Sequence, residues 1–164
     1  MTRLAKRGMW AGLALLLAGC AENGRPVSTP EMSLAPSDSL PVAIGSLPPQ
    51  DLSAGSCGLF LWRKGSATEL VFVADSRLPV ARMNLDGSPV TLSRTSAEGD
   101  LSPGALLRQR YESEGRTIDL AFIAEPQPGL IGGAAVKSGS LRISGADGWD
   151  MVLPVAGLIA CKPR

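Results

Sequence analysis

The sequence predicts an all-β domain over residues 57–164, built as a single antiparallel β-barrel or sandwich of about eight strands. Short apolar or alternating runs recur through this region between turn residues, which is the spacing of a sandwich or barrel. The chain has 19 glycines and 13 prolines, and only 4% of its 164 residues are aromatic. Turns are therefore frequent and long amphipathic helices are not expected. Barrel and sandwich stay open as alternatives, because both give the same alternation.

Eight strands are expected, each bounded by turn residues. The run 57–62, and the run 69–74 after Glu69, are continuously apolar, which predicts burial on both faces. Asp86-Gly87 lies between two alternating runs and predicts a type I′ hairpin, and Asp147-Gly148 marks another turn. Pro154 cannot donate a ladder hydrogen bond, so we expect it on an edge strand or at a bulge. The expected strands cover residues 57–62, 69–74, 80–85, 89–94, 105–111, 116–124, 139–145 and 149–161, with the longest loops at 95–104 and 125–133.

Residues 1–19 have the parts of a cleaved signal peptide. Three basic residues precede the apolar run MWAGLALLLA. This run is too short to span a bilayer, which takes about 20 residues. It ends in LAGC, residues 17–20, which resembles the lipobox of bacterial lipoproteins. The resemblance implies that Cys20 carries a diacylglycerol, that the signal is cut before it, and that the new amine receives an acyl chain such as palmitate.

Several acyl chains anchor a protein stably, since each buried CH₂ contributes about 0.8 kcal/mol. In Gram-negative lipoproteins an aspartate after the lipid-bearing cysteine favours retention at the inner membrane, and this chain has Ala21 there. The resemblance therefore implies the outer membrane, with the domain on its periplasmic side. Apart from the covalent lipid on Cys20, no cofactor is expected.

Residues 20–56 form the next expected segment, the lipidated cysteine followed by a disordered tether. The segment is rich in proline and serine, and it has too few large apolar side chains to offset the entropy of ordering. With Cys20 assigned to lipid, Cys57 and Cys161 remain as an even pair in an oxidising compartment. We expect a disulfide between them, with two separate buried thiols as the alternative.

Composition excludes several function classes. The chain has no histidine, so Ser-His-Asp, Cys-His and histidine-zinc chemistries cannot occur. No S-x-x-K motif provides a serine-lysine pair. Cleavage of the signal would leave 13 basic residues against 15 acidic ones, a net charge of −2, so nucleic acid is not an expected partner.

The remaining polar candidates are weak as catalytic groups. Two carboxylate pairs flank tight turns, where acidic side chains are usually just solvated: Glu112 with Glu114, and Asp147 with Asp150. Loop 95–104 offers only two carboxylates for calcium, so no metal site is expected. Arg108 and Arg110 lie two apart in one strand and could share an anion. No catalytic set is visible, and we expect a protein that is not an enzyme.

Two stretches carry a second resemblance. MNLDGSPVTLSRTSAEG (83–99) and WRKGSATEL (62–70) resemble segments of the membrane-bound inhibitors of c-type lysozyme. In this chain their order is reversed. That family consists of small antiparallel β-barrels, often lipid-anchored and disulfide-bonded, in which a loop serine and a lysine enter the lysozyme cleft. The resemblance implies that Ser96 and Lys64 would make those contacts.

The sequence thus predicts a lipid-anchored, periplasm-facing protein of the cell envelope with a non-catalytic binding or structural β domain. Its expected partners are the membrane, through the anchor, and a protein or peptidoglycan in the envelope. An inhibitor of a cell-wall hydrolase is the sharper alternative, and an enzyme is a third.

Overall fold

The computed structural model describes residues 42–99, 106–129 and 133–164. All of them belong to one compact unit, Ser37–Arg164. The signal peptide, Cys20 and the first part of the expected tether lie outside the described residues.

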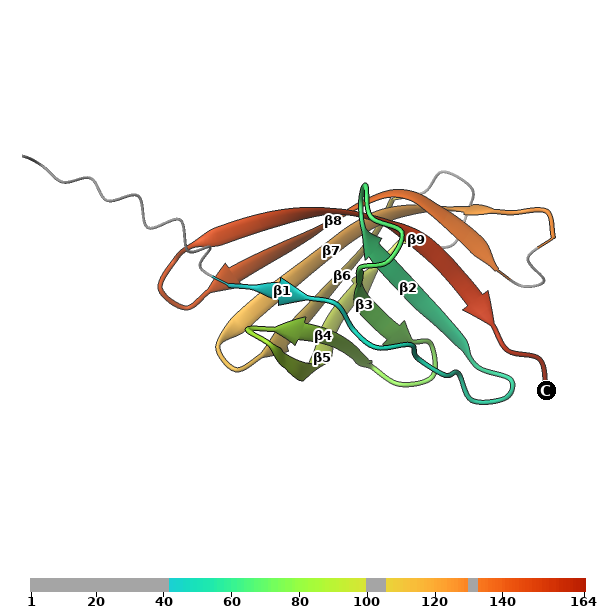
Figure 1. Cartoon of the computed structure of the whole chain (residues 1–164), viewed down its shortest axis with the longest axis horizontal. Coiled ribbons are helices and arrows are strands. Elements are labelled where there is room, and N and C mark those ends of the chain that lie inside the picture. The colour runs from blue at the N-terminus through green and yellow to red at the C-terminus, as the bar shows by residue number, and fades with distance from the viewer. Residues whose placement is uncertain (1–41, 100–105, 130–132) are drawn as a thin grey trace, which may run out of the picture. The chain divides into compact units, whose positions relative to one another are not determined.

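Eight of the strands in the described part of the chain form a closed antiparallel barrel (Figure 1). Each strand from β2 to β8 pairs with the next one along the chain, and β9 pairs with β2 to close the ring. The predicted all-β class is confirmed, and the closed ring decides for a barrel over a sandwich. The strands are β1 (Ile44–Gly45), β2 (Cys57–Arg63), β3 (Leu70–Asp75), β4 (Val80–Leu85), β5 (Ser88–Glu98), β6 (Leu106–Ser113), β7 (Arg116–Pro126), β8 (Ala134–Gly145) and β9 (Asp150–Cys161).

The eight predicted strands are all present, most of them with bounds within two residues of the prediction, but β5 and β8 are each five residues longer than expected. β5 continues through residues 95–98, which were predicted as loop, and β8 begins at Ala134 rather than at Gly139. Strands β7 and β8 form the longest ladder, with one register shift between Ile123 and Ala124. Loop and strand were hard to separate here because residues 95–98 and 134–138 are small or polar.

Tight turns join several of the strands. The Asp86-Gly87 hairpin has positive φ at both residues, 53° and 80°, as the type I′ prediction requires. Glu114-Gly115 has the same pair of signs, 48° and 72°. At Asp147-Gly148 only Gly148 has a positive φ, and the Gly145 N–H donates to the Trp149 carbonyl across a wider turn. The turn predicted at Asp147-Gly148 is therefore present, and it is not of type I′.

The interior of the barrel is filled by apolar side chains from every strand of the ring. In β7, Ile118, Leu120 and Phe122 are buried, and the alternate residues face outward, as the sequence pattern predicts. Phe72 of β3 and Tyr111 of β6 meet edge to face across the core, with ring centroids 5.3 Å apart. Both side chains are fully buried.

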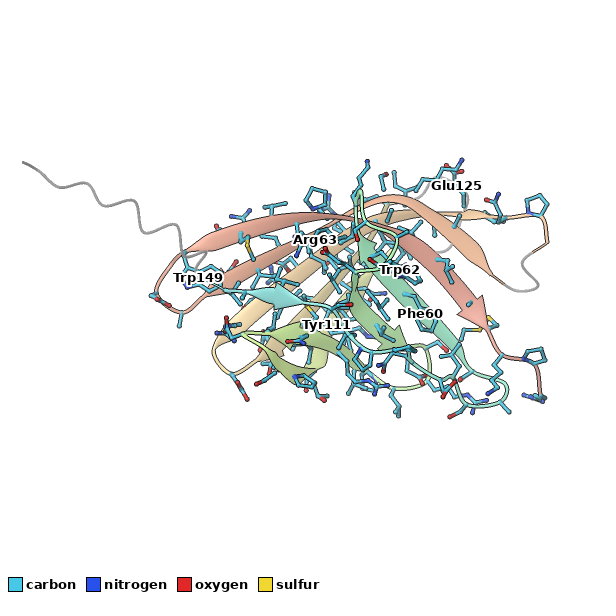
Figure 2. The ribbon with its side chains drawn as sticks, in the orientation of Figure 1. Phe60, Trp62, Arg63, Tyr111, Glu125 and Trp149 are labelled. Carbon is cyan, nitrogen blue, oxygen red and sulfur yellow. A yellow bond between two sulfur atoms is a disulfide. The ribbon has the colours of Figure 1, made fainter. Side chains whose placement is uncertain are left out.

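Residues 42–56 contradict part of the predicted tether. This covering segment pairs with β4 through β1, and the Leu47 N–H donates to the Leu70 carbonyl at 2.6 Å. Leu47 lies on the outer face of β2 and β3 and buries a second apolar cluster there, which includes Phe60 and Trp62 of β2 (Figure 2). The ordered domain therefore begins by Val42 rather than at Cys57. The physical reason is that two neighbouring strands are apolar on both faces, so their outer face needs a cover.

The predicted disulfide between Cys57 and Cys161 is confirmed. These two residues are also direct cross-strand partners, so the bond lies where the first and last strands of the ring meet. We call this end of the barrel the disulfide end. The β2–β3, β4–β5 and β6–β7 turns lie at the opposite end, because neighbouring strands are antiparallel.

Pro154 lies on a strand with neighbours on both sides, so the edge-strand alternative is wrong. The other alternative was a bulge, and the β8–β9 ladder does shift register next to Pro154, between the pairs Val136–Gly157 and Gly139–Val155. The Pro154 carbonyl accepts the Lys64 N–H at 3.0 Å, just beyond the last β2 pair, Arg63 with Val155. The nitrogen and carbonyl of one strand residue face the same neighbour. The missing N–H therefore faces Lys64 as well, so the reciprocal bond of this pair is absent at the point where the β2–β9 ladder ends.

Candidate functional site

A groove of about 400 Å³ crosses the outer face of strands β5 to β8. Its polar side chains come from strands far apart in the sequence, and antiparallel pairing brings them together. We call this set the arginine groove: Ser96, Glu98, Arg108, Arg110, Asp119, Ser140 and Arg142.

Two guanidinium groups of the arginine groove are held by carboxylates. Arg110 donates to both oxygens of Asp119, Nε at 2.7 Å and Nη2 at 3.1 Å. The hydrogen bond and the charge of Asp119 raise the pKa of Arg110 above its ordinary value. Arg142 pairs with Asp150, which also accepts the Ser144 hydroxyl at 2.5 Å. Hydrogen bonds from Arg142 and Ser144 lower the pKa of Asp150.

Arg108 differs from its two neighbours. It is exposed, and the structure records no ion pair for it among the described residues. Its cross-strand partner on β5 is Glu98, and its partner on β7 is Ala121. The arginine groove thus holds one arginine free to meet an external acceptor beside two whose orientation is fixed.

The structure brings some of the predicted site residues together and separates others. Ser96, Arg108 and Arg110 all lie in the arginine groove, and Ser96 is the cross-strand partner of Arg110. Lys64 follows β2 at the end of the barrel opposite the disulfide, whereas Ser96 lies near the end of β5, toward the disulfide end. Ser96 and Lys64, the pair that the lysozyme-inhibitor resemblance implies, therefore do not share one site.

The predicted carboxylate pairs are not organised as catalytic dyads. Asp150 is engaged by Arg142 and Ser144 rather than by Asp147. Glu112 lies on β6 and Glu114 in the turn after it. Of the two carboxylates in the predicted loop 95–104, Glu98 lies on β5 and Asp100 lies outside the described residues. Within the ranges that the structure describes, no three His, Cys, Asp or Glu side chains are grouped to hold a metal ion.

A second hollow, of about 340 Å³, opens at the disulfide end of the barrel. Residues of β2, β3, β5, β6, β7 and β9 line it, so it lies at the mouth of the ring and not on one outer face. We call it the mouth pocket. Its walls are mostly apolar: Leu59, Ala74, Leu107, Phe122 and Ile159. Its polar side chains include Arg94 and Gln109.

Tyr111, labelled in Figure 2, is fully buried in the core. Its hydroxyl donates to Gln109 Oε1 at 2.5 Å. Burial raises the pKa of the Tyr111 hydroxyl, and the charge and hydrogen bond of Arg94 oppose that rise. A connected polar set therefore reaches from the mouth pocket into the apolar interior.

No family model, curated protein or solved structure matches this chain. Within the described residues no helix is both long and apolar enough to cross a membrane. The candidate sites are therefore supported by the geometry of this structure and not by a related protein.

Sequence reasoning missed most of the groups that organise the two hollows. Arg94 follows buried Leu92 by two residues on β5, so strand alternation could have placed it inward. Asp119 alternates with Ile118 and Leu120 in the sequence, which is enough to place it on the outward face, but its pairing with Arg110 depends on the β6–β7 register. That register becomes predictable only when the Glu114-Gly115 turn is identified as a tight hairpin.

Proposed function

We propose that this protein is a lipid-anchored component of the cell envelope whose barrel binds a carboxylate-bearing partner without catalysis, through the arginine groove. The observation that carries the proposal is Arg108, an arginine without an ion pair that lies beside two arginines already fixed by carboxylates. The anchor on Cys20 would hold the barrel on the periplasmic side of the outer membrane.

The arginine groove suits a partner that presents carboxylates together with neutral polar groups. A guanidinium has five N–H donors, and Asp119 engages two of its groups on Arg110, Nε and Nη2. The remaining donors of Arg110 are left for an acceptor of the partner in the groove that Arg108 also lines, and the Ser96 and Ser140 hydroxyls would add neutral contacts. Because Arg110 and Arg142 are already oriented, little side-chain entropy is lost when a partner binds. Peptidoglycan stem peptides and protein surfaces both have this chemistry.

The lipid anchor is tested by Cys20→Ser in the full chain. We expect the wild type to incorporate a palmitate analogue and to fractionate with membranes, and the variant to lose the label completely, because only a thiol forms the thioether. Ala21→Ser is the matched control and should keep the label. A wild-type chain that takes up no label, or a Cys20→Ser chain labelled as strongly as the wild type, contradicts the anchor.

The arginine groove is tested by Arg108→Gln. Charge-assisted hydrogen bonds contribute about 1.5–3 kcal/mol, so we expect binding to weaken about tenfold or more. The measurement is cosedimentation of the full chain with purified peptidoglycan sacculi, and in parallel protection of those sacculi from a c-type lysozyme. Arg82→Gln, on the exposed face of β4, is the matched control.

The two arms of this experiment separate the two candidate functions. Binding to sacculi that depends on Arg108 supports a peptidoglycan partner. Protection that depends on Ser96, which lines the same groove, favours the inhibitor of a cell-wall hydrolase. If the wild type neither binds nor protects, or if Arg82→Gln is as impaired as Arg108→Gln, the arginine groove is not the site.

A further inference from the structure

The mouth pocket has the size and lining of a small-molecule site, and Gln109 is the one lining residue that it shares with the arginine groove. Its volume of about 340 Å³ falls within the range of ligand pockets, roughly 300–1,000 Å³. Mouths of β-barrels are among the usual places for such sites. The walls include Leu59, Leu107 and Phe122, which are at most 7% exposed and belong to the main core. An apolar ligand here would extend the existing core.

The direction of Arg94 follows from the strand register. Arg94 is the cross-strand partner of Tyr111, and directly opposed residues point to the same face of a sheet. Tyr111 is fully buried in the barrel, and the Arg94 guanidinium reaches its hydroxyl. Arg94 therefore points into the mouth of the ring, in contrast to the outward-facing Arg108.

Arg94 is half-buried and has no ion pair with a carboxylate among the described residues. Asp75 also lines the mouth pocket, but the hydrogen bond recorded for its carboxylate comes from the Arg77 backbone N–H, at 2.7 Å. A cation moved out of water is unfavourable unless an anion compensates it. An anion bound in the pocket would supply that compensation.

Gln109 adds a second donor directed by the fold. Its Oε1 accepts the Tyr111 hydroxyl, which leaves the amide NH₂ of the same side chain to donate elsewhere. Arg94 and Gln109 line the same pocket. Together they form a small polar patch with hydrogen-bond donors beside an apolar wall, which is complementary to a molecule with one anionic head and an apolar body.

We propose that the mouth pocket binds a single-chain amphiphile with a carboxylate head, a medium-chain fatty acid, with the head on Arg94 and Gln109 and the chain against the apolar walls. A carboxylate fits better than a phosphate monoester, because one guanidinium balances one negative charge, whereas a phosphate carries about two at neutral pH. This site is independent of the arginine groove and of the partner proposed for it.

The test is photolabelling of the full chain in membrane vesicles with a diazirine derivative of dodecanoate. We expect saturable labelling that maps to peptides of β6 and β7, which carry Leu107 and Phe122. Dodecanoate should compete with the probe, whereas dodecanol, which has the same chain without the charge, should compete about tenfold less well, because a charge-assisted hydrogen bond is lost. Dodecyl phosphate distinguishes a carboxylate site from a phosphate site.

Two variants complete the test. Arg94→Gln should reduce labelling about tenfold, and Arg108→Gln should leave it unchanged while it weakens binding at the arginine groove. Equal competition by dodecanoate and dodecanol in the wild type would overturn the carboxylate site, whether or not Arg94→Gln folds. Stronger competition by dodecyl phosphate than by dodecanoate, or labelling confined to the outside of the barrel, would overturn it as well.

Discussion

Replacing Gly157 with alanine should lower the free energy of unfolding by about 3 kcal/mol, the upper end of what overpacking typically costs. Gly157 lies on β9 opposite Leu61 of β2, where the ring closes. A methyl group on Gly157 would overlap the backbone carbonyl oxygen of Phe60 and would lie 3.0 Å from the Leu61 Cα. Because these are backbone atoms of a paired strand, they cannot move aside as a side-chain end can.

The measurement is a urea titration followed by circular dichroism, with the slope checked for two-state behaviour. Gly45→Ala is the matched control, since a methyl group there would meet the side chain of Asn84 rather than backbone. Gly45 is half-buried and the methyl group would lie 2.9 Å from the Asn84 Cγ, so that side chain must shift, and we expect a loss of about 1 kcal/mol, the lower end of the cost of overpacking. If the Gly157→Ala chain is as stable as the Gly45→Ala chain, the prediction is wrong. That result would mean that β2 and β9 can move apart at this position without loss of stability.

The number and order of the strands could be predicted because local signals mark them. Alternation at Ile118, Leu120 and Phe122 places one face of β7 inside, and Asp86-Gly87 fixes the hairpin between β4 and β5. Closure of the ring could not be predicted. It depends on the pairing of β2 with β9, whose residues are about 100 positions apart in the chain and carry no local sign of each other.

The covering segment was missed because composition describes an average over a stretch of chain. Residues 42–56 are rich in turn residues and look disordered as a group, but two apolar side chains attach them to the barrel. Val42 joins the main core and Leu47 joins the outer cluster on β2 and β3. The sequence signal for this cover lies in the strands beneath it, β2 and β3, and not in the segment itself. The stretch 70–74, which is apolar on both faces, requires cover on its outer side as well as its inner side.

In the candidate sites, too, some residues could be placed from local sequence patterns and others could not. The spacing of Arg108 and Arg110 was enough to place both on one outward face, and Ser96 joins them through the β5–β6 register. The acidic partners and the mouth pocket depend on contacts across strands, which no local pattern contains. Arg94 is the exception, because its position two residues after buried Leu92 already assigns it to the interior.

Removing the disulfide should cost about 3–4 kcal/mol of unfolding free energy. Cys57 and Cys161 are 104 positions apart, and in the chain-entropy model a loop of about 100 residues is worth up to about 4.7 kcal/mol. In the folded barrel the ladder between β2 and β9 already holds the two residues opposite each other. The bond therefore acts mainly by restricting the unfolded chain, and the variant Cys57→Ser/Cys161→Ser should keep the native far-ultraviolet spectrum.

Two features of the urea titration identify this mechanism. The slope should increase in the double variant, because an unfolded chain without the cross-link exposes more surface. Each single variant should lose as much stability as the double variant, within about 0.5 kcal/mol, since either substitution breaks the same bond. A loss below about 1 kcal/mol with an unchanged slope would mean that β2 and β9 stay paired after unfolding. In that case the disulfide would add little stability, because strand pairing alone would keep the barrel closed.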